Sequence, residues 1–416
     1  MSQPLDASPQ ASSKRPAAVK RHCMVVHAHY PVGETRVERQ AQALVRHGHQ
    51  VDVICLRDEG EAAVEERGSI NIYRLPVKRH VGSGPMAHLF EYIAFFVLAF
   101  AKLVQLHRQR RYAVIQVHNL PDFLVFAGLV PKLTGARLFL DIHDLMPEFY
   151  SARFNVSLAR WKVRLLIWQE QVSCRFADHV ITVSEHWRQT LIKRGVPAHK
   201  CSVVMNVADD GIFHLSNGSR RCRDNPSQFR LLYHGTIVQR YGLDLAIQAI
   251  DRVRQDIPNI HLTILGRGDY VATLTRMVEE LNLGGHVTIY NEVRPAQELP
   301  QIIRAADVGI VPYRNDRFTD ELLPTKLMEY AAIGLPAIAA RTTAINSYFA
   351  DTMVELFEPG NVDDLARCIR RLYTSPERLE ELAKGSIKFN QRYNWTKIGA
   401  EYVALVERMG SHSGTV

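Results

Sequence analysis

Residues 320–336 read DELLPTKLMEYAAIGLP, and this stretch predicts a loop, a helix, a helix stop and the start of a strand. Pro324 suits the first helical position, because its missing N–H would have no intrahelical partner there. Gly334 stands where a left-handed residue ends a helix, and Pro336 cannot extend one. Residues 337–340, Ala-Ile-Ala-Ala, then predict a short buried strand.

The start of this helix is a candidate anion site. The backbone N–H groups of Leu323, Thr325 and Lys326 would point out of the helix, where its dipole also favours negative charge. Lys326 adds a full positive charge, and the carboxylates of Glu321 and Glu329 bracket the site. Such a set suits a sugar nucleotide, because the diphosphate accepts hydrogen bonds while sugar and ribose hydroxyls donate them. A surface helix with solvated glutamates is the alternative.

The same stretch resembles glycosyltransferase family 4. The resemblance rests on Glu321 and Glu329, with seven residues between them, followed by Ala-x-Gly-x-Pro at residues 332–336. It covers residues 22–410 and implies a retaining enzyme with the GT-B fold, in which Leu323, Pro324 and Thr325 line the donor. The Pro-Thr-Lys-x-x-Glu-Tyr variant at 324–330 resembles a bacterial branch that builds cell-surface polysaccharides.

The charge of the chain is unevenly distributed. Of 416 residues, 46% are hydrophobic and 23% charged, which is ordinary for a globular protein of two or three domains. The net charge of +8 lies in residues 1–210, which carry 27 Lys and Arg against 19 Asp and Glu; residues 211–416 carry 24 of each. A basic half favours nucleic acid, an anionic membrane surface or an anionic substrate, with solubility alone as the alternative. We expect no nucleic-acid partner, because no such motif is present.

The six cysteines predict a reducing compartment. None forms a Cys-x-x-Cys pair and most lie in apolar segments, so we interpret them as reduced core thiols without a structural zinc site. Residues 1–20 lack the apolar core of a secretory signal and predict a disordered tail. We therefore expect a cytoplasmic protein, either free or peripheral at the inner face of the plasma membrane. The cysteines are Cys23, Cys55, Cys174, Cys201, Cys222 and Cys368.

Residues 89–106 form a long apolar segment. Ile93–Ala101 is an unbroken apolar run, but Glu91 and Lys102 interrupt the wider segment, which argues against a membrane span. We favour a buried helix; a helix on the membrane surface, followed by a basic run at 107–111, is the alternative. Helical apolar spacing also occurs in residues 158–176, at Trp161, Leu165, Trp168, Val172 and Phe176.

Strand and helix patterns alternate from residue 22 onward, which predicts two doubly wound α/β domains. We place the first at residues 21–214, a polar linker at 215–228 and the second at 229–394. By resemblance, the amphipathic helix at 395–416 crosses back onto the first domain. In the GT-B architecture two such Rossmann-like domains face each other across a cleft, where the carboxyl ends of their strands bind the ligand. The expected strands are 23–27, 51–56, 70–75, 114–117, 137–142, 179–183, 202–205, 230–233, 260–265, 287–290, 308–311, 336–340 and 354–357.

His118 directly follows the strand at 114–117. A lone histidine is more often structural, but its place at a carboxyl strand end favours function. By resemblance, it matches the family histidine that contacts the donor sugar near the reacting carbon, and we expect a positioning and electrostatic role. On the acceptor side we expect Asn119, Asp122, His143, Asp144 and Glu148. The cluster at 143–148 could also suggest a metal, but the resemblance implies metal-independent catalysis.

Residues 235–242, which we call the Gly235 loop, follow the first strand of the second domain. Many members of the family carry an arginine and a lysine in this loop, where this chain has Thr236 and Tyr241. We therefore expect Arg240 and Lys326 to stabilise the departing nucleoside diphosphate, on which negative charge grows in the transition state.

Three further loops are candidate donor contacts. Gly33 follows the first strand, where the family often has two adjacent glycines. Gly266-Arg267-Gly268 lacks the third glycine of a dinucleotide fingerprint, and the resemblance places this loop beside the nucleotide. The backbone of Glu292 and Val293 would read the edge of the base.

These patterns and the resemblance imply a glycosyltransferase that moves a sugar from a UDP- or GDP-linked donor to a glycan or lipid-diphosphate acceptor. The resemblance alone implies retention of anomeric configuration. Glu321 would hold sugar hydroxyls and Glu329 the ribose, and no cofactor is expected because the nucleotide sugar is a substrate. A GT-B sugar-nucleotide epimerase and a non-catalytic nucleotide-sugar sensor are the alternatives. An NAD-dependent oxidoreductase is more distant, because the Gly-x-Gly pattern is incomplete.

Overall fold

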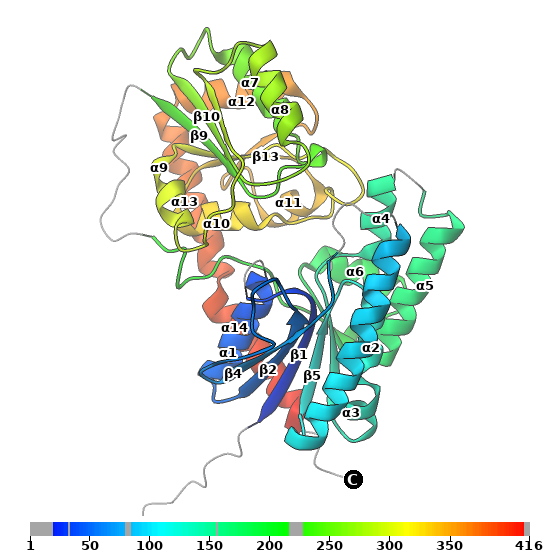
Figure 1. The fold of residues 1–416 in the computed structure, drawn as a ribbon. Coiled ribbons are helices and arrows are strands. Elements are labelled where there is room, and N and C mark those ends of the chain that lie inside the picture. The colour runs from blue at the N-terminus through cyan, green and yellow to red at the C-terminus, as the bar shows by residue number, and fades with distance from the viewer. Residues whose placement is uncertain (1–19, 32–33, 80–84, 155–156, 216–227, 412–416) are drawn as a thin grey trace, which may run out of the picture.

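The computed structural model describes residues 20–31, 34–79, 85–154, 157–215 and 228–411, and these residues form two sheets (Figure 1). The first sheet has the strand order β3-β4-β2-β1-β5-β6-β7-β8, and the second has the order β11-β10-β9-β12-β13-β14. Neighbouring strands are parallel except for β3, which pairs antiparallel with β4. The predicted pair of doubly wound α/β domains is confirmed.

The strands are β1 (Arg21–His29), β2 (Gln50–Leu56), β3 (Val64–Arg67), β4 (Ile70–Leu75), β5 (Val114–His118), β6 (Arg137–Ile142), β7 (His179–Thr182), β8 (Cys201–Val203), β9 (Phe229–His234), β10 (Ile260–Leu265), β11 (Val287–Tyr290), β12 (Val308–Val311), β13 (Ala337–Ala340) and β14 (Glu355–Phe357). The helices are α1 (Thr35–Arg46), α2 (Pro85–Arg110), η1 (Asp122–Gly128), α3 (Leu129–Leu133), α4 (Met146–Phe154), α5 (Trp161–Phe176), α6 (Glu185–Lys193), η2 (Ala198–Lys200), η3 (Gln239–Tyr241), α7 (Leu243–Val253), α8 (Val271–Glu280), α9 (Leu299–Ala305), α10 (Thr325–Ile333), α11 (Thr343–Tyr348), α12 (Val362–Thr374), α13 (Pro376–Arg392) and α14 (Trp395–Ser411).

Helices cover the first sheet on both faces. Helices α1 and α14 lie on one face, and α2, η1, α3 and α5 lie on the other (Figure 1). The last helix, α14, returns to the first sheet, where the Tyr402 hydroxyl donates a 2.6 Å hydrogen bond to Gln116 on β5. The expected linker falls almost wholly at residues 216–227, outside the described residues, as do residues 1–19 and Cys222. The other five cysteines are buried free thiols.

Helix α2 differs from the buried helix that we expected. Phe95, Ala99, Leu103 and Leu106 pack against the sheet. However, only 28% of the most apolar 18-residue stretch of α2 is buried. With a mean hydropathy of 1.8, α2 is the single described helix long and apolar enough to cross a membrane by length and composition, a criterion that core helices also meet.

Helix α5 confirms the helical spacing, but its apolar stripe points outward. The residues that it buries are Val163, Glu170, Ser173 and Cys174. The tryptophans and Leu165 of the stripe are exposed. Apolar spacing alone does not say on which side of a helix the core lies, because it fixes only that one face is apolar.

The segment around α10 has the structure that its sequence indicates, with one shift. Pro324 is the N-cap residue, and the helix begins at Thr325, one position later than expected. Gly334 ends the helix in the left-handed region, with φ +75°, and β13 follows at Ala337. The helix is fixed to the sheet by Tyr330, whose hydroxyl donates to the Leu232 carbonyl at 3.0 Å.

The two domains meet at the carboxyl ends of their strands, where an open sheet binds ligands beside the strands at which the chain order reverses. These are β1 and β5 in the first sheet and β9 and β12 in the second. Phe149 of α4 packs edge-to-face on Phe318, with ring centroids 5.4 Å apart. The backbone N–H of Glu185 donates to the Tyr348 hydroxyl at 2.8 Å. The two carboxyl edges are therefore in direct contact.

Candidate active site

His118 ends β5 and is fully buried at the carboxyl edge of the first sheet. Its Nδ1 lies 3.0 Å from His143 Nε2 and 3.3 Å from an oxygen of Asp141. Burial lowers the pKa of His118 to about 4, so the ring is neutral at pH 7. The Asp141 carboxylate favours the proton on Nδ1, which leaves a lone pair on Nε2. No described atom bonds this Nε2, so the ring can accept a hydrogen bond from a sugar hydroxyl.

Asp141 holds this arrangement together from the adjacent strand, β6. Its carboxylate accepts from Arg36 of α1 at 2.8 Å and from Gln40 at 2.9 Å. The charged side chains of Asp141 and Arg36 are both buried. Gln116 of β5 donates to it as well, at 3.2 Å. The pKa of Asp141 lies well below its usual range: burial alone would raise it, but the neighbouring Arg36 and the two histidines outweigh that effect. Asp141 is therefore the anionic centre that fixes His118.

His118, Asp141 and His143 also place possible metal-ligand atoms within 4.8 Å of one another. The donor set does not suit a cation. Both oxygens of Asp141 already accept hydrogen bonds, and the Arg36 guanidinium beside them is a fixed positive charge. The two histidines bond one another instead. These hydrogen bonds suit the positioning of His118 rather than the binding of a cation.

Asn119 joins the two strand-end loops on the acceptor side. Its amide donates to Asp122 Oδ1 at 2.9 Å and to the Asp144 carbonyl at 2.7 Å, and its oxygen accepts from the His143 N–H at 2.7 Å. Burial raises the pKa of Asp122 to about 6 and also raises that of Asp144. Asp122 Oδ2 has no described partner. Asn119 thus positions the loop, while Asp122 keeps an oxygen available.

Glu148 does not present the free carboxylate that the expected acceptor-side role requires. Its carboxylate is buried and accepts from Arg194, which also bonds Glu170 at 3.0 Å. A carboxylate committed to a buried arginine is costly to free, because the arginine would be left unpaired. Glu148 therefore supports the wall of the site.

Lys326 lies at the start of α10 in a cage of tyrosines. Its Nζ donates to the Tyr313 hydroxyl at 2.7 Å and lies 4.8 to 5.1 Å from the ring centroids of Tyr233, Tyr241 and Tyr313. Burial lowers the pKa of Lys326 to about 8. Tyr241, at the usual lysine position of the Gly235 loop, thus contributes its ring to the cage.

Glu329 lies one turn further along α10. Burial raises the pKa of its carboxyl to about 7, although Lys326 and Arg39 of the first domain pull it down. Glu329 Oε2 lies 3.3 Å from His234 Nε2 at the end of β9. Burial lowers the pKa of His234 to about 3, so His234 is neutral and this contact is not a pair of full charges.

Arg240 lies between the domains. Its guanidinium stacks over Phe149 of the first domain at 5.7 Å and over Phe318 of the second at 5.5 Å. The Nη1 atom is buried and bonds no described residue. A buried cationic donor without a partner is costly unless an anion completes it.

Glu321 also reaches across the domain interface. Its Oε1 lies 3.4 Å from His186 Nε2 on α6, whereas its Oε2 is buried without a described partner. Burial raises the pKa of Glu321, and His186 opposes that effect. Glu321 and Arg240 therefore each present an unsatisfied polar atom at this interface, and His118 presents one at the carboxyl edge of the first sheet.

Two glycines permit close contact between the loops of the second domain. A Cβ on Gly266 would lie 1.8 Å from the Gly235 carbonyl oxygen, and Gly235 itself, at φ +115°, leaves room for the Lys326 side chain. Gly266 is thus required by loop packing, and the donor contact that we expected of it stays a prediction. Arg267 and Val293 are exposed, and Glu292 pairs with Arg294 at 2.5 Å. Gly33 lies outside the described residues.

Four residues of the site were missed in the sequence: Asp141, His186, His234 and Tyr313. His234 ends β9 as His118 ends β5, so strand-end position could have identified it. Asp141 lies inside a strand, and its partner Arg36 is far away in the sequence. His186 follows the correctly expected N-cap Ser184, but only its approach to Glu321 marks it.

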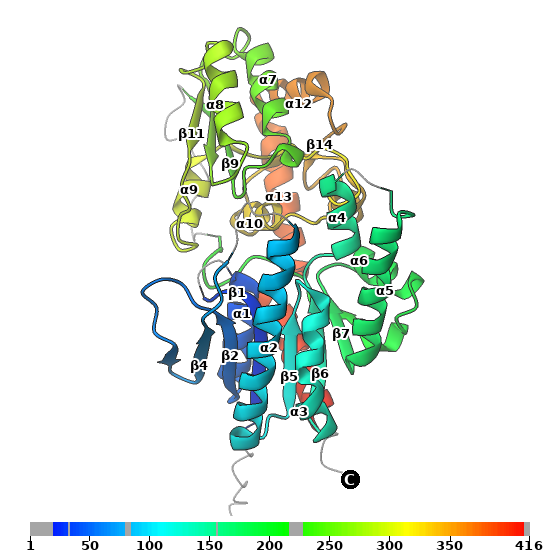
Figure 2. The ribbon, with the colours of Figure 1, turned by 45° about the vertical axis from the view of Figure 1, so that its right-hand side comes forward.

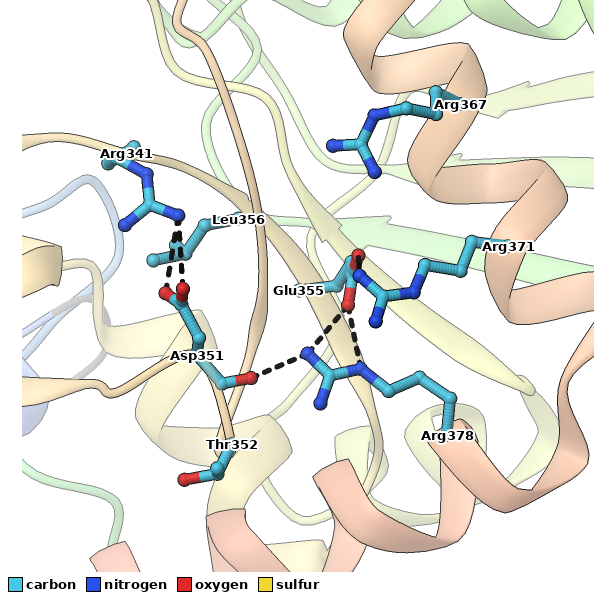
Figure 3. A pocket seen from close by; sticks show the side chains of 8 residues that line it. All are labelled: Arg341, Asp351, Thr352, Glu355, Leu356, Arg367, Arg371 and Arg378. Atoms are coloured by element: carbon cyan, nitrogen blue, oxygen red, sulfur yellow. Dashed lines mark hydrogen bonds and ion pairs between the residues drawn. The ribbon is translucent and has the colours of Figure 1, made fainter.

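A pocket of about 290 Å³ lies elsewhere in the second domain (Figure 3). Four arginines line it, but their charges are largely matched inside it. Buried Glu355 accepts from Arg371 and Arg378 at 2.9 Å each, and Arg341 lies 3.2 Å from Asp351. None of the expected donor residues contributes to this pocket, so we do not place the donor there.

Comparison with known proteins places the chain in context. Residues 33–206 match the model of the glycosyl transferase 4-like domain, and residues 220–389 match that of the glycosyl transferases group 1. The chitobiosyldiphosphodolichol beta-mannosyltransferase of Debaryomyces hansenii is 24% identical over 80% of this chain and 77% of its own. The putative colanic acid biosynthesis glycosyl transferase WcaI of Escherichia coli K12 is 26% identical over 75% and 78%. The structure of sucrose-phosphate synthase from Thermosynechococcus elongatus superposes with a TM-score of 0.74 at 19% identity, covering 94% of this chain and 100% of that one.

Proposed function

The chain belongs to glycosyltransferase family 4 and has the GT-B fold, and from this premise we propose a specific reaction. A hexose passes from a UDP- or GDP-linked donor to a lipid-linked or glycan acceptor in the synthesis of cell-surface polysaccharide, with retention of anomeric configuration. The colanic acid relative supports the polysaccharide role, and the mannosyltransferase named for a diphosphodolichol acceptor supports a lipid-linked one.

One observation carries the proposal: unsatisfied polar atoms of opposite character lie at the carboxyl edges of the two domains, which face one another. The second domain offers Arg240 Nη1, Glu321 Oε2 and the first-turn amides of α10. The first domain offers His118 Nε2. A nucleotide sugar supplies the complements, because its diphosphate takes the cationic and amide donors and its hydroxyls donate to Glu321 and His118.

Chemistry at this site depends on stabilising the leaving group. As the bond from the anomeric carbon to the β-phosphate oxygen breaks, negative charge grows on the diphosphate, next to Lys326 and Arg240. The acceptor oxygen bonds the same carbon, and its proton leaves with the departing phosphate. Burial strengthens these interactions, and closing the two domains on the donor limits hydrolysis.

The first experiment is a thermal shift assay with UDP, GDP and their glucose, N-acetylglucosamine, galactose and mannose conjugates. A ligand at about a hundred times its dissociation constant stabilises the folded state by about 2.7 kcal/mol. We expect a response to one nucleotide class. The responding donor is then incubated with lipid extract, and the products are analysed by mass spectrometry and proton NMR.

The products separate the alternatives. A glycosylated acceptor with the anomeric configuration of the donor supports the proposal, and an inverted product contradicts the retention. An epimerised sugar with free nucleotide indicates an epimerase, and binding without turnover indicates a sensor. Glu321→Gln should lose turnover while still binding the free nucleoside diphosphate. The matched control is Glu298→Gln, on an exposed surface glutamate, which should behave as wild type.

A further inference from the structure

Large exposed apolar side chains gather on one face of the first domain. Of the fifteen in the described part of the chain, eleven lie on α2, α3 and α5, and we call these eleven the apolar face. These helices cover the same face of the first sheet, with η1 in contact with both α2 and α5 (Figure 2). Scattered exposed apolar residues are normal, whereas a continuous cluster marks an interaction surface. The members are Met86, Leu89, Phe90, Ile93, Val97, Leu98, Leu129, Leu133, Trp161, Leu165 and Trp168.

The outward side of α2 carries no charge over four turns. Between Met86 and Ala101 every exposed residue is apolar, and polar exposed residues begin only at Gln105. Helix α14, on the opposite face of the same sheet, provides an internal comparison. It exposes Lys397, Glu401 and Arg408 among small residues, which is usual for a helix in water. The outward side of α2 is therefore suited to an apolar environment.

The charges around the apolar face have one sign. In the described residues of α2, η1, α3 and α5, each acidic side chain is buried: Glu91, Asp122 and Glu170. The charged side chains that these elements and their adjoining residues expose are all basic: Arg108, Arg111, Arg160, Lys162, Arg164 and Arg175. An apolar surface with tryptophans, framed by Lys and Arg, matches the interface of a membrane that contains anionic lipids.

We propose that the apolar face docks this protein on the surface of an anionic lipid bilayer, with α2 and α5 lying in the interface. Spanning is disfavoured, because α2 holds the sheet through its other face and Glu91 is buried 3.1 Å from His27. Helix α2 leads into β5 and α5 leads into β7, so Met86 and Trp161 lie towards the carboxyl edge of the sheet. Docking therefore brings the candidate active site close to the lipid. The docking proposal itself does not depend on the proposed transfer reaction.

The test is flotation of the full-length protein, without any substrate, with vesicles of three parts phosphatidylcholine to one part phosphatidylglycerol. We expect binding that weakens with salt and is at least about tenfold weaker to phosphatidylcholine alone. Replacing Phe90, Ile93 and Val97 together by Gln should weaken binding about tenfold or more, because these exposed side chains no longer enter the bilayer. The matched control replaces Ala400 and Ala404, exposed on α14, by Gln and should bind as wild type.

Tryptophan fluorescence reports on the orientation. Trp161 and Trp168 are 70% and 60% exposed, whereas Trp187 and Trp395 are 1% and 5% exposed. On vesicles, brominated lipids should quench the emission, and replacing Trp161 and Trp168 by Phe should abolish the quenching. The proposal is overturned if wild type does not float, if the triple variant floats equally well, or if bound protein resists alkaline carbonate as a spanning helix would. It is also overturned if the triple variant only abolishes self-association, since the face would then bind a second copy.

Discussion

Lys326 and Glu329 are ionisable residues on one helix turn with pKa values displaced towards neutrality. Burial lowers the pKa of Lys326 to about 8 and raises that of Glu329 to about 7. Above pH 8 Lys326 loses the charge that attracts the diphosphate in the proposed reaction. Below pH 7 Glu329 gains a proton and loses capacity to accept from the ribose hydroxyls that we expect it to bind. The pH range in which the free protein carries both charges is therefore narrow.

We predict a bell-shaped pH dependence of kcat/KM for the donor, with limbs near pH 7 and pH 8. Each limb should approach a tenfold fall per pH unit, because one proton is gained or lost. Lys326→Met should flatten the alkaline limb and Glu329→Gln the acidic one. In the bound complex the diphosphate raises the pKa of Lys326, so the alkaline limb of kcat should move to higher pH. Limbs that persist unchanged in both variants would assign the titration to other groups.

The sequence located residues whose role follows from position along the chain. His118 could be identified because it ends a strand, and Lys326 because it begins a helix. Asp141 could not, because a carboxylate inside a buried strand acquires its role only when Arg36 arrives from α1. The tyrosine cage around Lys326 could not be predicted either, because Tyr233, Tyr241 and Tyr313 come from three separate segments of the chain.

At the scale of elements, the Gly235 and Gly266 loops are packed backbone against backbone. The Ile237 N–H also donates to the Arg267 carbonyl at 2.8 Å, so the loops after β9 and β10 move as one. Any side chain at Gly266 must displace the Gly235 loop, which lies against the Lys326 side chain.

We predict that Gly266→Ala lowers the free energy of unfolding by about 1–3 kcal/mol, the usual cost of an overpacked contact. The affinity for the nucleoside diphosphate should fall as well, because the Gly235 loop is displaced. Urea unfolding and calorimetric titration measure the two effects. The control is Gly284→Ala, where an added Cβ meets no atom within 4 Å. Wild-type stability and affinity in Gly266→Ala would show that the loops relax without cost.

Elements were predicted well where periodicity and burial agree. The second sheet was expected strand by strand, because its strands are short apolar runs between helices. Strand β3 was missed because Val64–Arg67 is an exposed polar edge strand without an apolar pattern. The exposed face of α5 was not foreseen, and that of α2 was expected only as the alternative to a buried helix, since the same apolar spacing serves a core and a membrane surface.

At the scale of the whole molecule, the contact between His186 and Glu321 links the domains at the sugar end of the proposed site. The two residues come from α6 and from the loop before α10, and their 3.4 Å approach exists only when the domains are together. His186 can therefore align Glu321 after closure without touching the nucleotide. Neither residue alone indicated this contact in the sequence.

We predict that His186→Ala lowers kcat about tenfold or more, because a misaligned sugar-binding carboxylate weakens orientation of the donor. The dissociation constant of the free nucleoside diphosphate should change less than about twofold, since Lys326 and Arg240 are untouched. His186→Gln, which keeps a donor near Glu321, should recover most of the rate, and in a Glu321→Gln background His186→Ala should cost little more. The control is His199→Ala, on an exposed histidine of η2. Equal losses in rate and nucleotide affinity would instead mean that His186 supports the fold of the interface, because a residue acting only through Glu321 cannot alter binding of a ligand that lacks the sugar.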